Sequence, residues 1–215
     1  MTGKTHLAGG FAAGAAVAWA DTQFLLVDAL LASTVDIAGV SLPVLVPGIA
    51  VSMVAALLPD IDEPQSLIAN SPTAIKRELG KGRKGLDRRT RQSAGMLLTV
   101  VQWVTTGLAM LIRLLAGGHR GATHMFLITA ALGAGAFFLG NAIGFPSLWL
   151  WFTAGYLSHL LLDMMTPSGL EVLWPLWRRS LRLLPRPIAI TTGTAGDTVV
   201  RVLLAGLGAW LLMAR

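Results

Sequence analysis

Hydrophobic residues along the chain gather in long runs that are separated by short polar connections. The apolar runs fall at residues 7–20, 42–58, 94–116, 125–145, 147–165 and 198–214. Several of them approach the roughly 20 residues that an α-helix needs to cross a bilayer. Because backbone polar groups in lipid must be satisfied within each segment, the pattern predicts an all-α, polytopic bundle of membrane helices.

The composition supports a membrane protein. Of 215 residues, 54% are hydrophobic and 13% are charged, whereas a soluble domain carries about twice that charged fraction. The chain has no cysteine, which excludes disulfides and leaves only nitrogen and oxygen ligands for a metal. We therefore expect a single membrane-embedded domain that covers residues 1–215.

The formal net charge of +6 raises the question of an anionic partner. The basic residues stand beside the predicted membrane segments, and the sequence contains no nucleic-acid-binding motif. Membrane lipids, including anionic head groups, are the expected partners rather than nucleic acid. The oligomeric state is left open.

The distribution of basic residues predicts which loops face the cytoplasm. Residues 76–91 hold eight Lys or Arg against two acids, and residues 178–186 hold four more. By the positive-inside rule, a basic segment at 66–93 and a loop at 166–197 are cytoplasmic. Residues 21–41 contain three aspartates and no basic residue, so we expect an external amphipathic helix and loop there.

Two segments admit more than one interpretation. A simple crossing by residues 94–116 would put the following loop on the wrong face, so we expect a re-entrant or interface-lying helix. Residues 1–20 have the features of a cleavable signal peptide that ends at Ala20. We favour a retained helix, because this segment carries one of only four histidines in the chain.

Histidines and aspartates stand at the predicted cytoplasmic ends of the apolar runs. These residues are His6, Asp60, Asp62, His119, His124, His159 and Asp163. His159 and Asp163 are four residues apart, so both project from one face of a helix. The glycines around His119 indicate a loop, and Thr123 is a candidate N-cap that places His124 in a first helical turn.

Each of these residues also has a purely structural interpretation. A single histidine at a helix end is most often hydrogen bonded at the membrane interface. Asp60 and Asp62 are able to cap a helix or to neutralise the basic loop that follows them, and Arg120 is able to serve as one more positive-inside residue. Convergence of all the histidines at one level favours a shared site, and the pair His159 and Asp163 within an apolar helix is its strongest member.

Neutral imidazoles with carboxylates suit Zn²⁺, Mn²⁺ or Fe²⁺. The six expected metal ligands are His6, Asp60, His119, His124, His159 and Asp163. This number exceeds the need of one tetrahedral ion, so we expect one or two divalent ions, Zn²⁺ or Mn²⁺. Arg120 is expected to hold a phosphate oxygen and Asp62 to orient a ligand or act as general base.

The motifs "THLAGG", "LLPDIDEPQS", "HRGATH" and "GYLSHLLLDMMTPSGLEVLWP" resemble, in this order, those of the YdjM family of bacterial inner-membrane proteins. Members are also described as LexA-regulated proteins with an inferred metal-dependent hydrolase activity. A more distant likeness, to zinc phospholipase C and related zinc nucleases, points to phosphoester cleavage.

The resemblance implies a bacterial inner-membrane location and places the six ligands, Asp62 and Arg120 at the family's site positions. It also implies that Thr166, Gly169 and the pair Trp174-Pro175 shape the rim of the site. Two positions depart from the family pattern, since Glu63 stands where His is more frequent and Met125 where Ser is common.

Three functions fit these residues. The leading interpretation is a membrane-bound, metal-dependent hydrolase that cleaves a phosphoester of a lipid or lipid-like substrate at the cytoplasmic face. The second is a transporter that binds a passing metal or relays protons, although the candidate ligands gather at one face rather than at the bilayer midplane. The third is a non-catalytic protein in which a metal only ties helices together.

Overall fold

The structure is a computed structural model of the chain and describes residues 1–24, 33–37, 40–61 and 122–215. The chain forms two compact units, Met1–Pro59 with Ala122–Arg215, and Asp60–Gly121. The first unit is described below, together with Asp60 and Ile61, which follow it directly. The predicted basic segment at 66–93 and the apolar run 94–116 lie outside the described residues.

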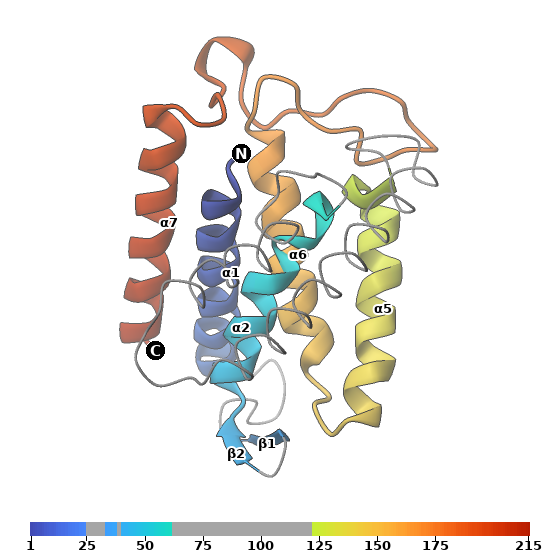
Figure 1. Cartoon of the computed structure of the whole chain (residues 1–215), viewed down its shortest axis with the longest axis vertical. Coiled ribbons are helices and arrows are strands. Elements are labelled where there is room, and N and C mark those ends of the chain that lie inside the picture. Colours follow the sequence, from blue (N-terminus) through green and yellow to red (C-terminus); the bar gives the residue numbers. More distant parts are fainter. Residues whose placement is uncertain (25–32, 38–39, 62–121) are drawn as a thin grey trace, which may run out of the picture. The chain divides into compact units, whose positions relative to one another are not determined.

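Five α-helices build the described part of the fold (Figure 1): α1 (Gly3–Phe24), α2 (Leu45–Ala55), α5 (Phe126–Ala142), α6 (Leu148–Met164) and α7 (Ala195–Met213). Single turns of 3-10 helix accompany them: η2 (Leu58–Asp60), η3 (Ala122–His124) and η4 (Arg186–Ile188). The helices coincide with five of the six apolar runs, so the mainly helical fold class is confirmed.

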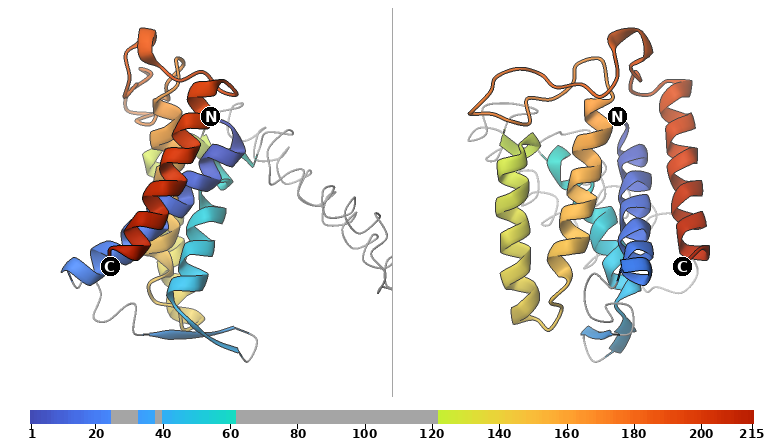
Figure 2. Two further views of the ribbon diagram at one scale, coloured as in Figure 1. Left: turned by 90° about the vertical axis from the view of Figure 1, so that its left-hand side faces the viewer. Right: turned by 180° about the vertical axis from the view of Figure 1, so that it is seen from behind.

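Helices α1 and α6 each pack against three other described helices. Helix α6 contacts α1, α2 and α5, whereas α7 packs against α1; the helices are seen from the side and from behind in Figure 2. Trp151, Tyr156 and Leu160 of α6 are fully buried and anchor its two apolar clusters. Helix α6 is therefore packed against three neighbouring helices.

The prediction for residues 21–41 is wrong in part. Helix α1 continues to Phe24, and residues further on form an antiparallel hairpin of β1 (Thr34–Ile37) and β2 (Val40–Pro43). The β-branched residues of this stretch favour extended backbone. Asp36 and Ser41 face each other across the hairpin and are hydrogen bonded, so that one aspartate pairs across strands instead of lining an amphipathic helix.

The described helices differ in whether they are long and apolar enough to cross a membrane. Only α7 is both long enough and apolar enough to cross a bilayer among the described helices, while α5 and Leu45–Asp60 are apolar but shorter. Residues 42–58 yield a shorter helix than their apolar length suggests, because Val40–Pro43 belong to β2 and the helix ends at Ala55. The multi-pass arrangement stays a prediction.

Close approach between α2 and α6 depends on Gly155. A Cβ at this position would overlap the backbone carbonyl of Ser52, whose hydroxyl donates to the Gly10 carbonyl of α1 at 2.8 Å. Backbone atoms cannot move aside as a flexible side chain does, so the three helices interlock around small residues.

Gly155→Ala is therefore expected to destabilise the protein by about 1–3 kcal/mol, the usual range for an overpacked core. Thermal unfolding in detergent checks this. Gly135→Ala is the matched control: a Cβ there meets no atom within 4 Å, so replacing this helical glycine should stabilise by about 0.5–1 kcal/mol. Equal melting temperatures for the two variants would contradict the packing argument.

Candidate metal centre

The last turns of α6 supply the centre of the candidate site. His159 and Asp163 are both buried, and Asp163 is 1% exposed. The Nδ1 atom of His159 lies 2.8 Å from the carbonyl oxygen of Ala56, just beyond the end of α2. Since a carbonyl only accepts, Nδ1 carries the proton and Nε2 keeps its lone pair, which is the tautomer that a metal ligand needs.

His124 joins this pair from the start of α5. It belongs to η3, which precedes the buried Met125 at the helix N-cap. Its Nε2 atom lies 3.2 Å from Nε2 of His159 and 3.9 Å from Oδ2 of Asp163, while the His159 and Asp163 atoms are 3.8 Å apart. The three potential ligand atoms thus converge on a single small volume.

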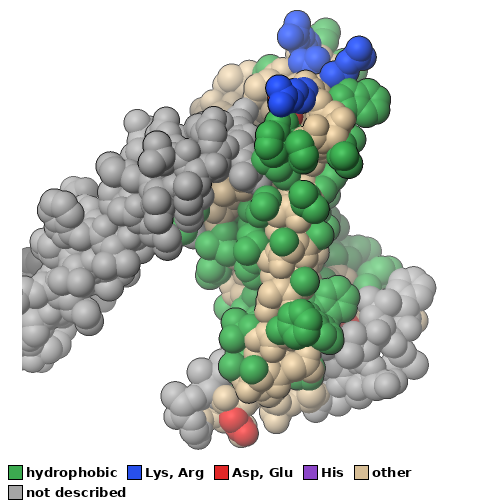
Figure 3. All heavy atoms as spheres, turned by 90° about the vertical axis from the view of Figure 1, so that its right-hand side faces the viewer, with side chains coloured by type: hydrophobic (Ala, Val, Ile, Leu, Met, Phe, Trp, Pro, Cys, Tyr) green, Lys and Arg blue, Asp and Glu red, His purple; other side chains and the backbone are tan. Residues whose placement is uncertain are grey.

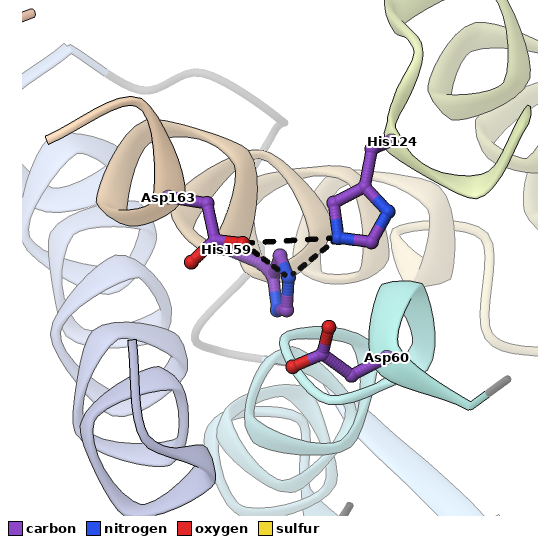
Figure 4. A group of neighbouring side chains, drawn as sticks. All are labelled: Asp60, His124, His159 and Asp163. Atoms are coloured by element: carbon purple, nitrogen blue, oxygen red, sulfur yellow. Dashed lines mark hydrogen bonds and ion pairs between the residues drawn. The ribbon is translucent and has the colours of Figure 1, made fainter. Parts of the chain in front are cut away.

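Asp60 completes a group of four. It ends η2, which begins shortly after α2. One ligand atom from each of Asp60, His124, His159 and Asp163 lies within 4.8 Å of the others. Figure 4 shows the four side chains pointing toward one another. Two ligands that each lie about 2.0–2.2 Å from a tetrahedral Zn²⁺ are roughly 3–4 Å apart, so the spacings of the His124, His159 and Asp163 atoms fit such an ion.

His6 approaches the other side of the Asp163 carboxylate. Its ring stacks on that of His159 with centroids 3.8 Å apart, and its Nε2 atom lies 3.3 Å from Oδ1 of Asp163. Asp163 therefore directs Oδ2 toward His124 and His159, and Oδ1 toward His6. The two oxygens of this carboxylate therefore face imidazole nitrogens on both sides.

The Asp163 carboxylate already pairs with a cation in the structure. The ammonium group of Met1 donates to Oδ1 at 2.5 Å, and both groups are buried. A buried carboxylate needs such a partner because burying an unpaired charge is costly. The imidazoles and carboxylates around it form a donor set of the kind that divalent metal ions bind.

Neighbouring groups hold the ligands in place. The hydroxyl of Tyr156 donates to the Thr123 carbonyl at 2.5 Å, next to His124, and Thr166 donates to the Asp163 carbonyl at 2.6 Å. Thr166 and Gly169, with the cis Trp174-Pro175 bond, begin the loop after α6. At Gly169 the backbone has φ +64, which favours glycine.

The structure brings together five of the eight site residues expected from the sequence. They are His6, Asp60, His124, His159 and Asp163. Asp62, His119 and Arg120 lie outside the described residues, as does Glu63. Their roles stay predictions.

Sequence reasoning missed two contacts that support the candidate site. The Ala56 carbonyl that sets the tautomer of His159 has no sequence signal, because any residue supplies a carbonyl. Asp197, in the first turn of α7, accepts a hydrogen bond from Thr5 at 2.7 Å. Its only signal was an acidic residue at the start of an apolar run, a pattern that normally indicates a helix cap.

Comparison with known proteins bears directly on this arrangement. The sequence profile described as YdjM inner membrane protein matches residues 1–214. The chain belongs to the YdjM family. It is 31% identical over 143 residues to the inner membrane protein YdjM of Escherichia coli strain K12 and to the protein of the same name from Shigella flexneri.

These alignments cover 62% of the chain and 52% of each relative, so the chain spans about half the length of the curated YdjM proteins that it matches. Their names support a location in the bacterial inner membrane. No solved structure shows a significant match to the chain. Membership in the YdjM family carries no established catalytic activity, so the chemistry has to be argued from the site.

Proposed function

We propose that this YdjM family protein is a polytopic inner-membrane hydrolase that uses one or two divalent ions, Zn²⁺ or Mn²⁺, to cleave a phosphoester of a lipid or lipid-like substrate at the cytoplasmic face. The observation that carries the proposal is the convergence of His124, His159 and Asp163 with Asp60 at one end of the helices. Ionisable groups buried among apolar helices are costly and usually functional.

Different residues of the chain would have different roles in this function. His124, His159, Asp163 and Asp60 would hold the ion, and His6 would hold the far side of the Asp163 carboxylate. A bound Zn²⁺ or Mn²⁺ supplies Lewis acidity toward a phosphoryl oxygen and toward water. Asp60 is partly exposed, whereas the other three members of the group are buried, so substrate would approach from the Asp60 side.

The loop after α6 supports a lipid substrate. Leu176 is 94% exposed, and the exposed Trp174 and Trp177 stand with it. Exposed arginines follow in the same loop: Arg178, Arg179, Arg182 and Arg186. Figure 3 shows basic side chains gathered beside apolar ones at one end of the molecule. Aromatic and basic residues together are typical of a surface at the lipid head groups, where arginine binds phosphate.

Two residues outside the described part complete the proposed mechanism. Arg120 would hold the anionic phosphoryl group through its planar pair of donors. Asp62 would orient a ligand or act as general base. Both proposals come from the sequence.

Release of inorganic phosphate or head group from mixed bacterial lipids tests the function. We expect hydrolysis that needs added Mn²⁺ or Zn²⁺ and stops with chelator. Arg120→Lys should keep its metal but lose about 10²-fold to 10³-fold in rate, because a point charge replaces a bidentate fork. Hydrolysis that persists under chelation would refute the metal role, and loss of metal in Arg120→Lys would make Arg120 a clamp on the ligands.

A non-catalytic, metal-tied bundle is the second candidate, favoured by the full burial of His6, His124 and His159. In that case the metal should raise the melting temperature through preferential binding to the folded state, while lipid phosphoesters stay intact. Metal-dependent hydrolysis by the same preparation decides against this candidate.

A further inference from the structure

Another buried aspartate, outside the candidate metal centre, lies at the start of α7. Asp197 is 2% exposed, although an acid in the first turn of a helix usually faces water. Its Oδ2 atom accepts from the backbone N–H of Gly193 at 3.0 Å, which is a local capping contact of the kind common at helix starts. Helix capping accounts for the contact of Oδ2 but not for the contact of Oδ1.

The second oxygen reaches a different helix. Oδ1 accepts from the hydroxyl of Thr5 in α1 at 2.7 Å, and Thr5 is itself fully buried. Thr2 also donates to the Asp197 carboxylate, from its backbone N–H and from its hydroxyl, and the Thr2 hydroxyl lies 2.9 Å from that of Thr5. The contact between Thr5 and Asp197 joins residues 192 positions apart, and it holds the first turn of α1 against α7.

The hydrogen bond between Thr5 and Asp197 lies next to the proposed metal centre. Thr5 precedes His6, whose ring stacks on His159 and whose Nε2 atom lies 3.3 Å from Asp163. Both Thr5 and His6 stand in the first turns of α1, and helix ends fray unless something ties them down. An anchor at Thr5 therefore restricts where the His6 ring lies.

We infer that Asp197 is a positioning residue: through Thr5 it fixes the first turn of α1 and so holds His6 against Asp163 in the metal centre. The inference rests on the proposed metal site. Groups that support metal ligands in this way usually contribute 10-fold to 100-fold in metal affinity.

The test compares Thr5→Val, which removes one bond between the helices, with Asp197→Ala, which removes that bond, the contacts from Thr2 and the cap. Zn²⁺ affinity is measured against a competing chelator in the full-length protein. We expect each variant to bind Zn²⁺ about 10-fold more weakly than the wild type. The double variant should bind no more weakly than Asp197→Ala alone, because Asp197→Ala already removes the acceptor of the Thr5 hydrogen bond. Asp197→Asn, which keeps an accepting oxygen for Thr5, should restore most of the affinity.

Gly208→Ala is the matched control for a general loss of packing between α1 and α7. A Cβ there would lie 2.6 Å from the Phe11 ring, roughly three turns along α7 from Asp197. This variant should lower the melting temperature while Zn²⁺ affinity stays within twofold of the wild type. Equal affinity losses in Gly208→Ala and Thr5→Val would overturn the positioning role.

A readout without metal separates this inference from the proposed function. Amide hydrogen exchange over residues 2–8 should be faster in Thr5→Val and Asp197→Ala than in the wild type, and unchanged in Gly208→Ala. If the wild type binds no Zn²⁺ yet exchange responds as expected, the proposed metal function fails and the anchor stands. If exchange is unchanged in Thr5→Val, the anchor is wrong.

Discussion

Asp163→Asn is expected to empty the metal centre and to abolish hydrolysis. Oδ2 of Asp163 faces His124 and His159, and Oδ1 faces His6. An amide is a poor ligand for a divalent ion, and its NH₂ group presents donors where the site needs acceptors. Bound metal, measured by elemental analysis of detergent-purified protein, should fall below about a tenth of the wild-type content, with hydrolysis reduced at least about 10²-fold.

Asp36→Asn is the control for removing one carboxylate from the chain. Asp36 is an exposed residue of the β-hairpin that is hydrogen bonded to Ser41, and it lies outside the group of candidate ligands. Its metal content and activity should match the wild type. A folded Asp163→Asn protein with full metal content would show that Asp163 is not a metal ligand.

His159→Asn gives the second large effect and separates metal binding from folding. The side-chain nitrogen of asparagine occupies nearly the position of Nδ1 in histidine, so it retains the bond to the Ala56 carbonyl that anchors α6 to α2. It has no atom at the Nε2 position, which lies 3.2 Å from His124. We expect metal affinity to fall at least about 100-fold while the secondary structure, followed by circular dichroism, is unchanged.

His159→Ala serves as the comparison. It removes the ligand nitrogen and also leaves the Ala56 carbonyl without this partner, in a site where the side chain is fully buried. An unmade buried hydrogen bond costs about 1–3 kcal/mol, so His159→Ala should melt at a lower temperature than His159→Asn in the metal-free state. Retention of metal by His159→Asn would show that Nε2 is not a ligand.

If both variants behave as expected, metal binding also stabilises the fold. Its candidate ligands come from α6, from the start of α5 and from the residues that follow α2. An ion that binds all of them stabilises the folded state by linkage, since no such site exists in the unfolded chain.

Much of the helical fold was predictable because hydrophobic runs report helices directly. The runs at 125–145 and 147–165 match α5 and α6 closely, with Gly144 at φ +74 in the turn between them. The prediction of a helix and loop for residues 34–43 was wrong. A short alternating stretch with β-branched residues fits a hairpin as well as a helix, and only the pairing of Asp36 with Ser41 distinguishes the two. The length of α2 was overestimated because apolar character continues into residues that are not helical.

The residue types of the candidate site could also be predicted from the sequence. His159 and Asp163 are four positions apart, and helical geometry alone puts them on one face. That His6, His124 and Asp60 stand at matching ends followed from the alternation of helices up and down. The position of a residue along a helix indicates at which end its side chain lies, but not which neighbouring helix the side chain faces.

What the sequence by itself determined about this protein is its family, its helical class and the chemical types available to a metal. Only the tertiary structure decided that the two oxygens of Asp163 serve different histidines, that the Ala56 carbonyl sets the tautomer of His159, and that Asp197 reaches Thr5 across 192 residues. The physical reason is that period and composition are properties of neighbouring residues, whereas these contacts depend on how three or four helices rotate and slide against one another. Small residues such as Gly155 determine that packing, and its outcome is a sum over many weak contacts that no single motif records.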